Sequence, residues 1–274
     1  MPHAQPTHAA RPPILRGNGP NDADRMWNKV PEVTAAFWFI KVLATTVGET
    51  GADFLASHIN PAVAYGVIGA GFVAALGGQL RARRYIPWLY WLTVVLVSVV
   101  GTLLTDGLTD ALSVSLFTST AVFSVLLAGV FAAWYWRERT LSIHTIVTRR
   151  REAFYWAAIL CTFALGTAAG DLSAEQLALG YEVSTVMFVG LIAGVMAVFF
   201  LGGNAILTFW IAYILTRPLG ASLGDLLSQP VANGGFGFGA TATSVAFLAA
   251  ILTLVGVLSV AERRRRLMPR TAGN

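Results

Sequence analysis

Apolar residues gather in eight stretches of about 20 residues, and segments richer in charged residues, proline and glycine separate them. An α-helix rises about 1.5 Å per residue, so roughly 20 apolar residues can cross the hydrocarbon core of a bilayer. The pattern therefore predicts eight membrane-spanning helices. Their expected bounds are 33–56, 61–80, 87–109, 113–134, 153–173, 182–202, 205–227 and 240–261.

The odd-numbered stretches share one pattern. Each carries an aromatic residue followed by tryptophan, a glycine eleven residues after that aromatic residue, and an aspartate sixteen residues after it. Four gap-free copies indicate an internal repeat, with expected bounds of 33–84, 87–138, 152–202 and 205–262. The recurring residues are Phe37-Trp38, Tyr90-Trp91, Tyr155-Trp156 and Phe209-Trp210; Gly48, Gly101, Gly166 and Gly220; and Asp53, Asp106, Asp171 and Asp225.

The repeat predicts the fold class. Each copy is expected to be a helical hairpin, so that the odd-numbered helices cross in the same direction and the copies are parallel. The expected fold is an all-α polytopic membrane protein, with eight transmembrane helices arranged as four parallel hairpin repeats with pseudo-fourfold symmetry. A small residue follows each repeat glycine by four positions, a spacing that lets helices pack closely in lipid. We therefore assign the four glycines to helix packing.

Composition and charge support a membrane protein and predict its orientation. Only 12% of the 274 residues are charged, whereas soluble domains carry about 25%. Seventeen of the nineteen Lys and Arg residues lie in segments that eight crossings would place on one side. The positive-inside rule then places both termini in the cytoplasm, and we expect the bacterial inner membrane as the location.

The terminal segments and the aromatic pairs complete this topology. Residues 1–30 are expected to form a disordered cytoplasmic tail and 263–274 a basic one, which contacts anionic lipid rather than nucleic acid. The aromatic-tryptophan pairs are expected to mark the cytoplasmic membrane interface.

A polar stripe runs along each odd-numbered stretch. Residues four apart share a helix face, and stepping by four from each repeat aspartate reaches further polar side chains in every copy. The stripes contain Lys41, Thr45, Glu49 and Asp53; Thr102 and Asp106; Thr167 and Asp171; and Arg217 and Asp225.

Ionised groups in a bilayer are costly, at about 2.5–3.5 kcal/mol each on insertion scales, so they default to functional roles. We interpret five acids as a path for a cation and protons and as metal ligands, with Thr45, Thr102 and Thr167 beside them. These acids are Glu49, Asp53, Asp106, Asp171 and Asp225. Lys41 and Arg217 are expected to be their counter-ions. Oxygen ligands select hard divalent ions, and no histidine or cysteine accompanies them to favour zinc or copper.

The motifs also support a resemblance. The segment "KVLATTVGETGADFL" (41–55), with echoes at 98–108, 162–172 and 216–226, resembles a bacterial family of membrane proteins defined by a repeat of unknown function. The resemblance covers about residues 30–262 and implies a multi-span repeat fold. The three later copies keep only the glycine and the aspartate, so the four copies need not have equal roles.

The hypothesis from sequence is a proton-coupled transporter that exports a divalent cation such as manganese. We expect no cofactor other than a bound cation. The expected partners are the lipid bilayer, the cation and protons, and the sequence is compatible with a homo-oligomer. Transport of a small organic solute and a non-transporting sensor or scaffold are the alternatives. An intramembrane aspartyl protease is disfavoured, because "LGD" at 223–225 follows Ser222 rather than the glycine of that family's motif, and no Pro-Ala-Leu motif occurs. We therefore predict no enzyme activity.

Overall fold

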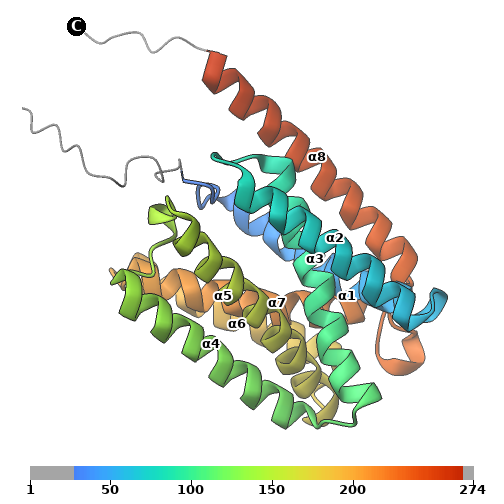
Figure 1. Cartoon of the computed structure of the whole chain (residues 1–274). Coiled ribbons are helices and arrows are strands. Elements are labelled where there is room, and N and C mark those ends of the chain that lie inside the picture. Colours follow the sequence, from blue (N-terminus) through green and yellow to red (C-terminus); the bar gives the residue numbers. More distant parts are fainter. Residues whose placement is uncertain (1–27, 268–274) are drawn as a thin grey trace, which may run out of the picture.

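The computed structural model describes residues 28–267, apart from the side chains of residues 110, 111 and 265–267. The described residues form eight long helices joined by short helical turns (Figure 1). The elements are α1 (Ala35–His58), α2 (Pro61–Arg81), α3 (Pro87–Asp106), η2 (Gly107–Ala111), α4 (Leu116–Glu138), η3 (Ile143–Thr145), α5 (Arg149–Asp171), η4 (Leu172–Gln176), α6 (Gly180–Phe200), α7 (Ala205–Ser228), η5 (Val231–Asn233) and α8 (Ala240–Leu267).

Local sequence explains where several helices begin. The side-chain oxygens of Asn60 and Asn204 accept hydrogen bonds from the first backbone N–H groups of α2 and α7. Such caps satisfy donors that have no partner within the helix. Pro61 and Pro87 occupy the first turns of α2 and α3, where the missing N–H of proline costs nothing.

The helices agree with the expected spans to within four residues, except at the end of α8. There the helix continues to Leu267, so the first residues of the expected basic tail are helical. Lys29 and Val30, which the expected N-terminal tail includes, are buried in the protein. The remainder of both expected tails, 1–27 and 268–274, lies outside the described residues.

Seven of these helices, α2 to α8, are long and apolar enough to cross a membrane. Helix α1 has 24 residues, a length of about 36 Å, but it carries Lys41, Glu49 and Asp53. Lys41 and Glu49 are buried among other helices. The chain is therefore a multi-pass membrane protein, and the charges that set α1 apart point into the protein.

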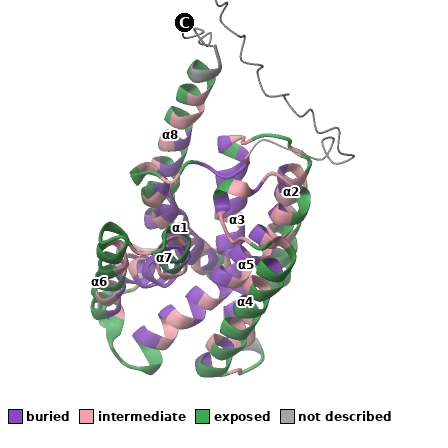
Figure 2. Ribbon diagram, turned by 90° about the vertical axis from the view of Figure 1, so that its left-hand side faces the viewer, coloured by how far each residue is buried: buried purple, intermediate pink, exposed green. Residues whose placement is uncertain are grey.

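The odd-numbered helices form the interior of the bundle and the even-numbered helices surround it. Helix α1 packs against α3 and α7, and α5 packs against α3 and α7, so the four inner helices close a ring. Buried residues concentrate on these four helices, whereas α4 and α6 are largely exposed (Figure 2).

The outer helices pack mainly on the inner helix that follows them in the chain. Helix α2 packs on α3, α4 on α5, α6 on α7, and α8 returns to α1. The hairpin pairing expected within each repeat is not confirmed, since α1 and α2 pack only weakly against each other. Each outer helix instead links two neighbouring repeats.

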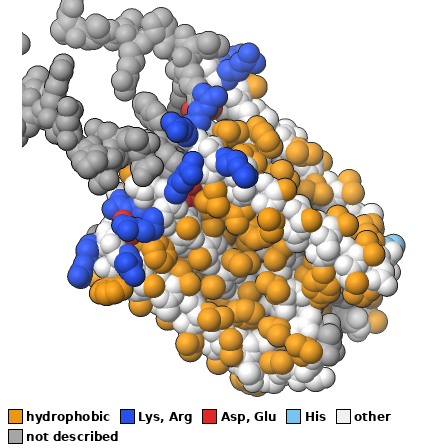
Figure 3. Space-filling view, viewed as in Figure 1, with side chains coloured by type: hydrophobic (Ala, Val, Ile, Leu, Met, Phe, Trp, Pro, Cys, Tyr) orange, Lys and Arg blue, Asp and Glu red, His pale blue; other side chains and the backbone are white. Residues whose placement is uncertain are grey.

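The surface of the bundle separates apolar and basic regions. Apolar side chains cover most of the face shown in Figure 3, and Lys and Arg side chains gather at one end of it. Helix α1 begins and α8 ends at this end (Figure 1). We call it the basic end, and the opposite end, toward which the repeat aspartates lie, the carboxylate end.

Candidate functional site

Each repeat glycine lies at a close approach between two inner helices. A methyl group added to Gly101 would lie 2.8 Å from Cβ of Phe163, and one added to Gly220 would overlap Thr45. Each contact joins one repeat to the next, and the last returns to the first, so the glycines bring the polar stripes together. The four contacts are Gly48 with Ser98, Gly101 with Phe163, Gly166 with Arg217, and Gly220 with Thr45.

Arg217 on α7 occupies the centre of the ring. Its side chain is fully buried and contacts the other three inner helices. Nη1 donates to Oε2 of Glu49 on α1 at 3.1 Å, and Nη2 donates to Oγ1 of Thr102 on α3 and, at 2.6 Å, to Oγ1 of Thr167 on α5. Thr102 in turn donates to Oε2 of Glu49 at 3.3 Å. These bonds pair Arg217 directly with the stripe acid Glu49.

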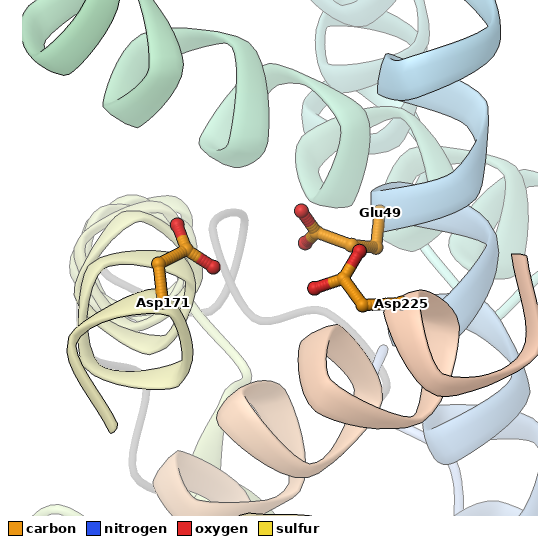
Figure 4. Close-up of side chains that lie close together, drawn as sticks. All are labelled: Glu49, Asp171 and Asp225. Carbon is orange, nitrogen blue, oxygen red and sulfur yellow. The ribbon is translucent and has the colours of Figure 1, made fainter. Parts of the chain in front are cut away.

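Three carboxylates converge beside this ion pair. One carboxylate oxygen each from Glu49, Asp171 and Asp225 lies within 4.8 Å of the other two. The three side chains come from α1, α5 and α7 and point toward one another (Figure 4). Glu49 and Asp225 are buried and Asp171 is partly buried. We call this group the acid cluster.

The other two repeat aspartates are not part of the acid cluster. Asp53, one turn beyond Glu49 on α1, accepts a 3.5 Å hydrogen bond from Nε2 of Gln229. Asp106 ends α3, and a π-helical turn follows it directly. The same turn follows Asp171 at the end of α5, whereas α1 and α7 continue as α-helix beyond Asp53 and Asp225. The four aspartates therefore have two kinds of backbone setting.

Two further residues of the stripes face other groups. The hydroxyl of Thr45 lies 2.7 Å from the carbonyl oxygen of Val42 and 3.2 Å from that of Thr216, so it joins α1 to α7 rather than serving the acids. Lys41 forms no ion pair with the stripe acids. Nζ of Lys41 lies 4.4 Å from the ring centre of Phe163 and 4.2 Å from that of Tyr213, and it makes no hydrogen bond.

The aromatic-tryptophan pairs form an interior layer, which sequence reasoning missed. Trp91, Trp156 and Trp210 are buried within the bundle, so the interpretation as membrane-interface anchors is wrong for them. The first aromatic residue of each repeat contacts the tryptophan of the next, and the last contact closes on the first repeat. The ring contacts are Phe37 with Trp91, Tyr90 with Trp156, Tyr155 with Trp210, and Phe209 with Trp38.

A second ion pair, which the sequence analysis also did not predict, lies at the basic end. Nζ of Lys29 lies 2.5 Å from Oε2 of Glu152 and donates to the carbonyl oxygen of Gln79 at 3.0 Å. Lys29 and Glu152 are each about 1% exposed. The pair joins residues 123 positions apart, and no spacing in the sequence indicates it.

An apolar groove lies on the side of the bundle. It has a volume of about 1010 Å³ and is lined by α1, α6, α7 and residues 141–144. Trp38, Phe39, Met196 and Phe209 are among its lining residues, and none of the five stripe acids is.

Comparison with curated proteins and with solved structures found no match. A family model, the Repeat of Unknown Function (DUF347), matches four successive segments that together cover most of the chain: 36–85, 89–140, 154–202 and 208–264. These segments follow the repeats expected from the aromatic, glycine and aspartate spacing. The chain therefore belongs to the DUF347 family, with four copies of its repeat.

Proposed function

We propose that this protein transports a hard cation across the membrane in exchange for protons, with the acid cluster as the site where the two compete. The observation that carries the proposal is the convergence of Glu49, Asp171 and Asp225 within 4.8 Å, from three different helices.

The electrostatics of the cluster support a bound cation or proton. Two full negative charges no more than 4.8 Å apart repel by at least about 3.5 kcal/mol at an effective dielectric constant of 20. Arg217 forms an ion pair with Glu49 only, and so offsets one charge of three. A divalent cation or added protons would offset the others. Carboxylate and hydroxyl oxygens suit ions such as Mn²⁺, Mg²⁺ or Ca²⁺.

The architecture supports a pathway that runs along the bundle axis. We propose that the four repeats are related by pseudo-fourfold symmetry, since the glycine contacts and the aromatic contacts each form a closed cycle. We also propose that α1 crosses the membrane as the eighth span, because its charged residues Lys41 and Glu49 face protein rather than lipid.

The distribution of basic residues supports an orientation. We propose a bacterial inner membrane protein with the basic end in the cytoplasm, by the positive-inside rule. The acid cluster then lies on the outer side of the aromatic layer. Protons that enter from outside would neutralise the carboxylates and displace the cation outward, so an inward proton gradient would drive export. Manganese is the ion that we propose to test first.

A second candidate is transport of a small organic solute. The apolar groove of about 1010 Å³ favours it, since sites for organic ligands are concave, mostly apolar and of comparable volume. This candidate would not require ionised groups at the acid cluster.

The test removes ionisation from the acid cluster while keeping its shape. The purified full chain is placed in proteoliposomes that contain a Mn²⁺-sensitive dye or a pH-sensitive dye, and a pH step starts the exchange. We expect Asp225→Asn and Asp171→Asn each to reduce Mn²⁺ movement strongly. Glu182→Gln, an exposed acid on α6, is the matched control and should transport as wild type does. If the double variant Asp171→Asn/Asp225→Asn exchanges Mn²⁺ and protons at the wild-type rate, the proposed function is wrong.

A further inference from the structure

Several buried polar groups lie between the acid cluster and the basic end and are not members of the acid cluster. They lie in or beside the aromatic layer, and they come from α1, α3, α5 and α7. In order from the acid cluster they are Lys41, Tyr213, Tyr155, Tyr90 and Glu152.

Lys41 lies between Arg217 and the aromatic layer. It is fully buried, its Nζ has no hydrogen-bond partner, and the rings of Phe163 and Tyr213 flank it. Contacts with aromatic faces can hold an ammonium group. Because no carboxylate pairs with the amine, it can release and regain a proton without breaking an ion pair.

The three tyrosines continue the sequence of polar groups through the layer. The hydroxyls of Tyr155 and Tyr90 are hydrogen-bonded at 2.6 Å, with either oxygen able to donate. Tyr213 carries the ring that faces Lys41; its hydroxyl makes no hydrogen bond in this structure and lies near the side chain of Tyr155. All three tyrosines are buried, and the phenylalanine and tryptophan rings of the aromatic layer carry no oxygen.

The tyrosine pair leads to the ion pair at the basic end. Tyr90 and Tyr155 line a small internal void together with Lys29, Gln79 and Glu152. Oε2 of Glu152 is bonded to Lys29, but Oε1 is buried and makes no hydrogen bond. A free carboxylate oxygen therefore stands at the far side of the layer, next to the same void as the two hydroxyls.

We propose that protons pass between the acid cluster and the basic end along Lys41, Tyr213, Tyr155, Tyr90 and Glu152, a path that the transported cation does not share. This inference rests on the proposed function and adds a proton pathway that is separate from the cation pathway.

The transfer needs no chemistry other than the making and breaking of N–H and O–H bonds. Inward movement begins when the amine of Lys41 takes a proton from the acid-cluster side. The ammonium then passes a proton to a hydroxyl, each tyrosine oxygen accepts one proton and donates another, and Glu152 receives the last. Glu152 then releases this proton at the basic end, and every group regains its original bonds after the hydroxyls turn back. Lys29 beside Glu152 and Arg217 beside Lys41 are the fixed cations at the two ends.

The same layer is unsuited to a metal ion. Among its described residues the only carboxylate is Glu152, which is paired with Lys29, and phenol and indole groups are poor substitutes for the several oxygen ligands of a divalent cation. Protons can therefore pass a layer that retains the cation.

The experiment measures proton flux and cation binding separately on the full chain. In proteoliposomes with an internal pH dye, a potassium gradient and valinomycin drive proton uptake. Binding of radioactive Mn²⁺ to the protein in detergent is measured by equilibrium dialysis. Tyr155→Phe removes the central hydroxyl and keeps the ring, and Lys41→Met removes the amine. Tyr65→Phe is the matched control, because it removes a hydroxyl bonded to the carbonyl oxygen of Leu103 away from the layer.

We expect Tyr155→Phe and Lys41→Met to reduce proton flux by about 10²-fold, the lower end of what a positioned proton-transfer group contributes. Mn²⁺ binding should stay within twofold of wild type (roughly 0.4 kcal/mol), which also shows that the variants are folded. Tyr90→Phe should behave as Tyr155→Phe does, since it removes the other member of the same hydrogen bond.

Undiminished proton flux in Tyr155→Phe and Lys41→Met, with Mn²⁺ exchange intact, would overturn the relay and leave the proposed function standing. An equal loss of proton flux in Tyr65→Phe would also overturn it. A wild-type protein that neither binds nor exchanges Mn²⁺ would remove the proposed function, and the relay with it.

Discussion

The ion pair between Arg217 and Glu49 gives the most direct test of the central site. Its atoms are 3.1 Å apart, and the two side chains are 0% and 6% exposed. Removing one partner of such a pair leaves an uncompensated buried charge and costs about 3–5 kcal/mol. Arg217→Gln should therefore lower the free energy of unfolding by about 3–5 kcal/mol. The same substitution also removes the hydrogen bonds that Arg217 donates to Thr102 and Thr167.

A double-mutant cycle separates the pair from its surroundings. We expect the double variant Glu49→Gln/Arg217→Gln to be more stable than Arg217→Gln alone, since glutamine at position 49 leaves no unpaired buried charge. The free energy of unfolding is measured for all four proteins by reversible unfolding in mixed detergent micelles. A loss below about 1 kcal/mol for Arg217→Gln, typical of an exposed pair, would refute the reasoning, as would strict additivity in the cycle.

Three further predictions use the same unfolding measurement or simple labelling. Gly220→Ala should destabilise by about 1–3 kcal/mol because its methyl group would overlap Thr45, whereas Gly190→Ala, which meets open space on α6, should change stability by less than about 1 kcal/mol; equal effects would contradict the close packing. Lys29→Ala should cost about 3 kcal/mol, because it strands the buried Glu152, and a stability equal to wild type would show that the pair is dispensable. In a cysteine-free background, a cysteine at position 58 should react with an impermeant reagent outside intact cells and one at position 83 should not; labelling of position 83 from outside would reverse the orientation.

The helices and the repeat could be predicted from sequence because both depend on short-range spacing. Apolar runs of about 20 residues set the spans, and the steps of four that linked Glu49 to Asp53 describe a face of one helix. The prediction that polar faces turn inward follows from the cost of exposing charge to lipid, and the burial of Lys41, Glu49 and Arg217 agrees with it.

What the sequence could not predict is how the faces meet. Helix spacing puts the four repeat aspartates at equal depths, yet the structure joins Asp171 and Asp225 to Glu49 and leaves Asp53 and Asp106 outside the cluster. The backbone at the aspartates differs as well, because π-helical turns follow Asp106 and Asp171 but not the other two. The spacing within a single repeat carries no information about how the four inner helices meet.

Two other errors have a common cause. Tryptophan at the end of an apolar stretch has the same local sequence whether it faces lipid headgroups or another helix. The interface interpretation therefore failed for the rings that pack between repeats, such as Trp91. Lys29 likewise stands in a proline-rich, polar segment, and its partners are remote in sequence: a carboxylate 123 residues away and the carbonyl oxygens of Gln79 and Leu80.

Divergence between the repeats explains why four copies produce one central ion pair. The residue directly after the repeat glycine is polar in three copies and alanine in the fourth, while the residue three positions before the glycine is arginine only in the fourth. The first set is Glu49, Thr102, Thr167 and Ala221, and the second is Thr45, Ser98, Phe163 and Arg217. Arg217 thus reaches across the ring to the three polar side chains, and its own helix offers only the small Ala221 at that level. Four identical arginines or glutamates would place like charges a few ångströms apart, and each pair would cost several kcal/mol in a dry interior. An ion pair at the centre of this repeat protein therefore requires that the copies differ: the first repeat supplies Glu49 and the fourth supplies Arg217.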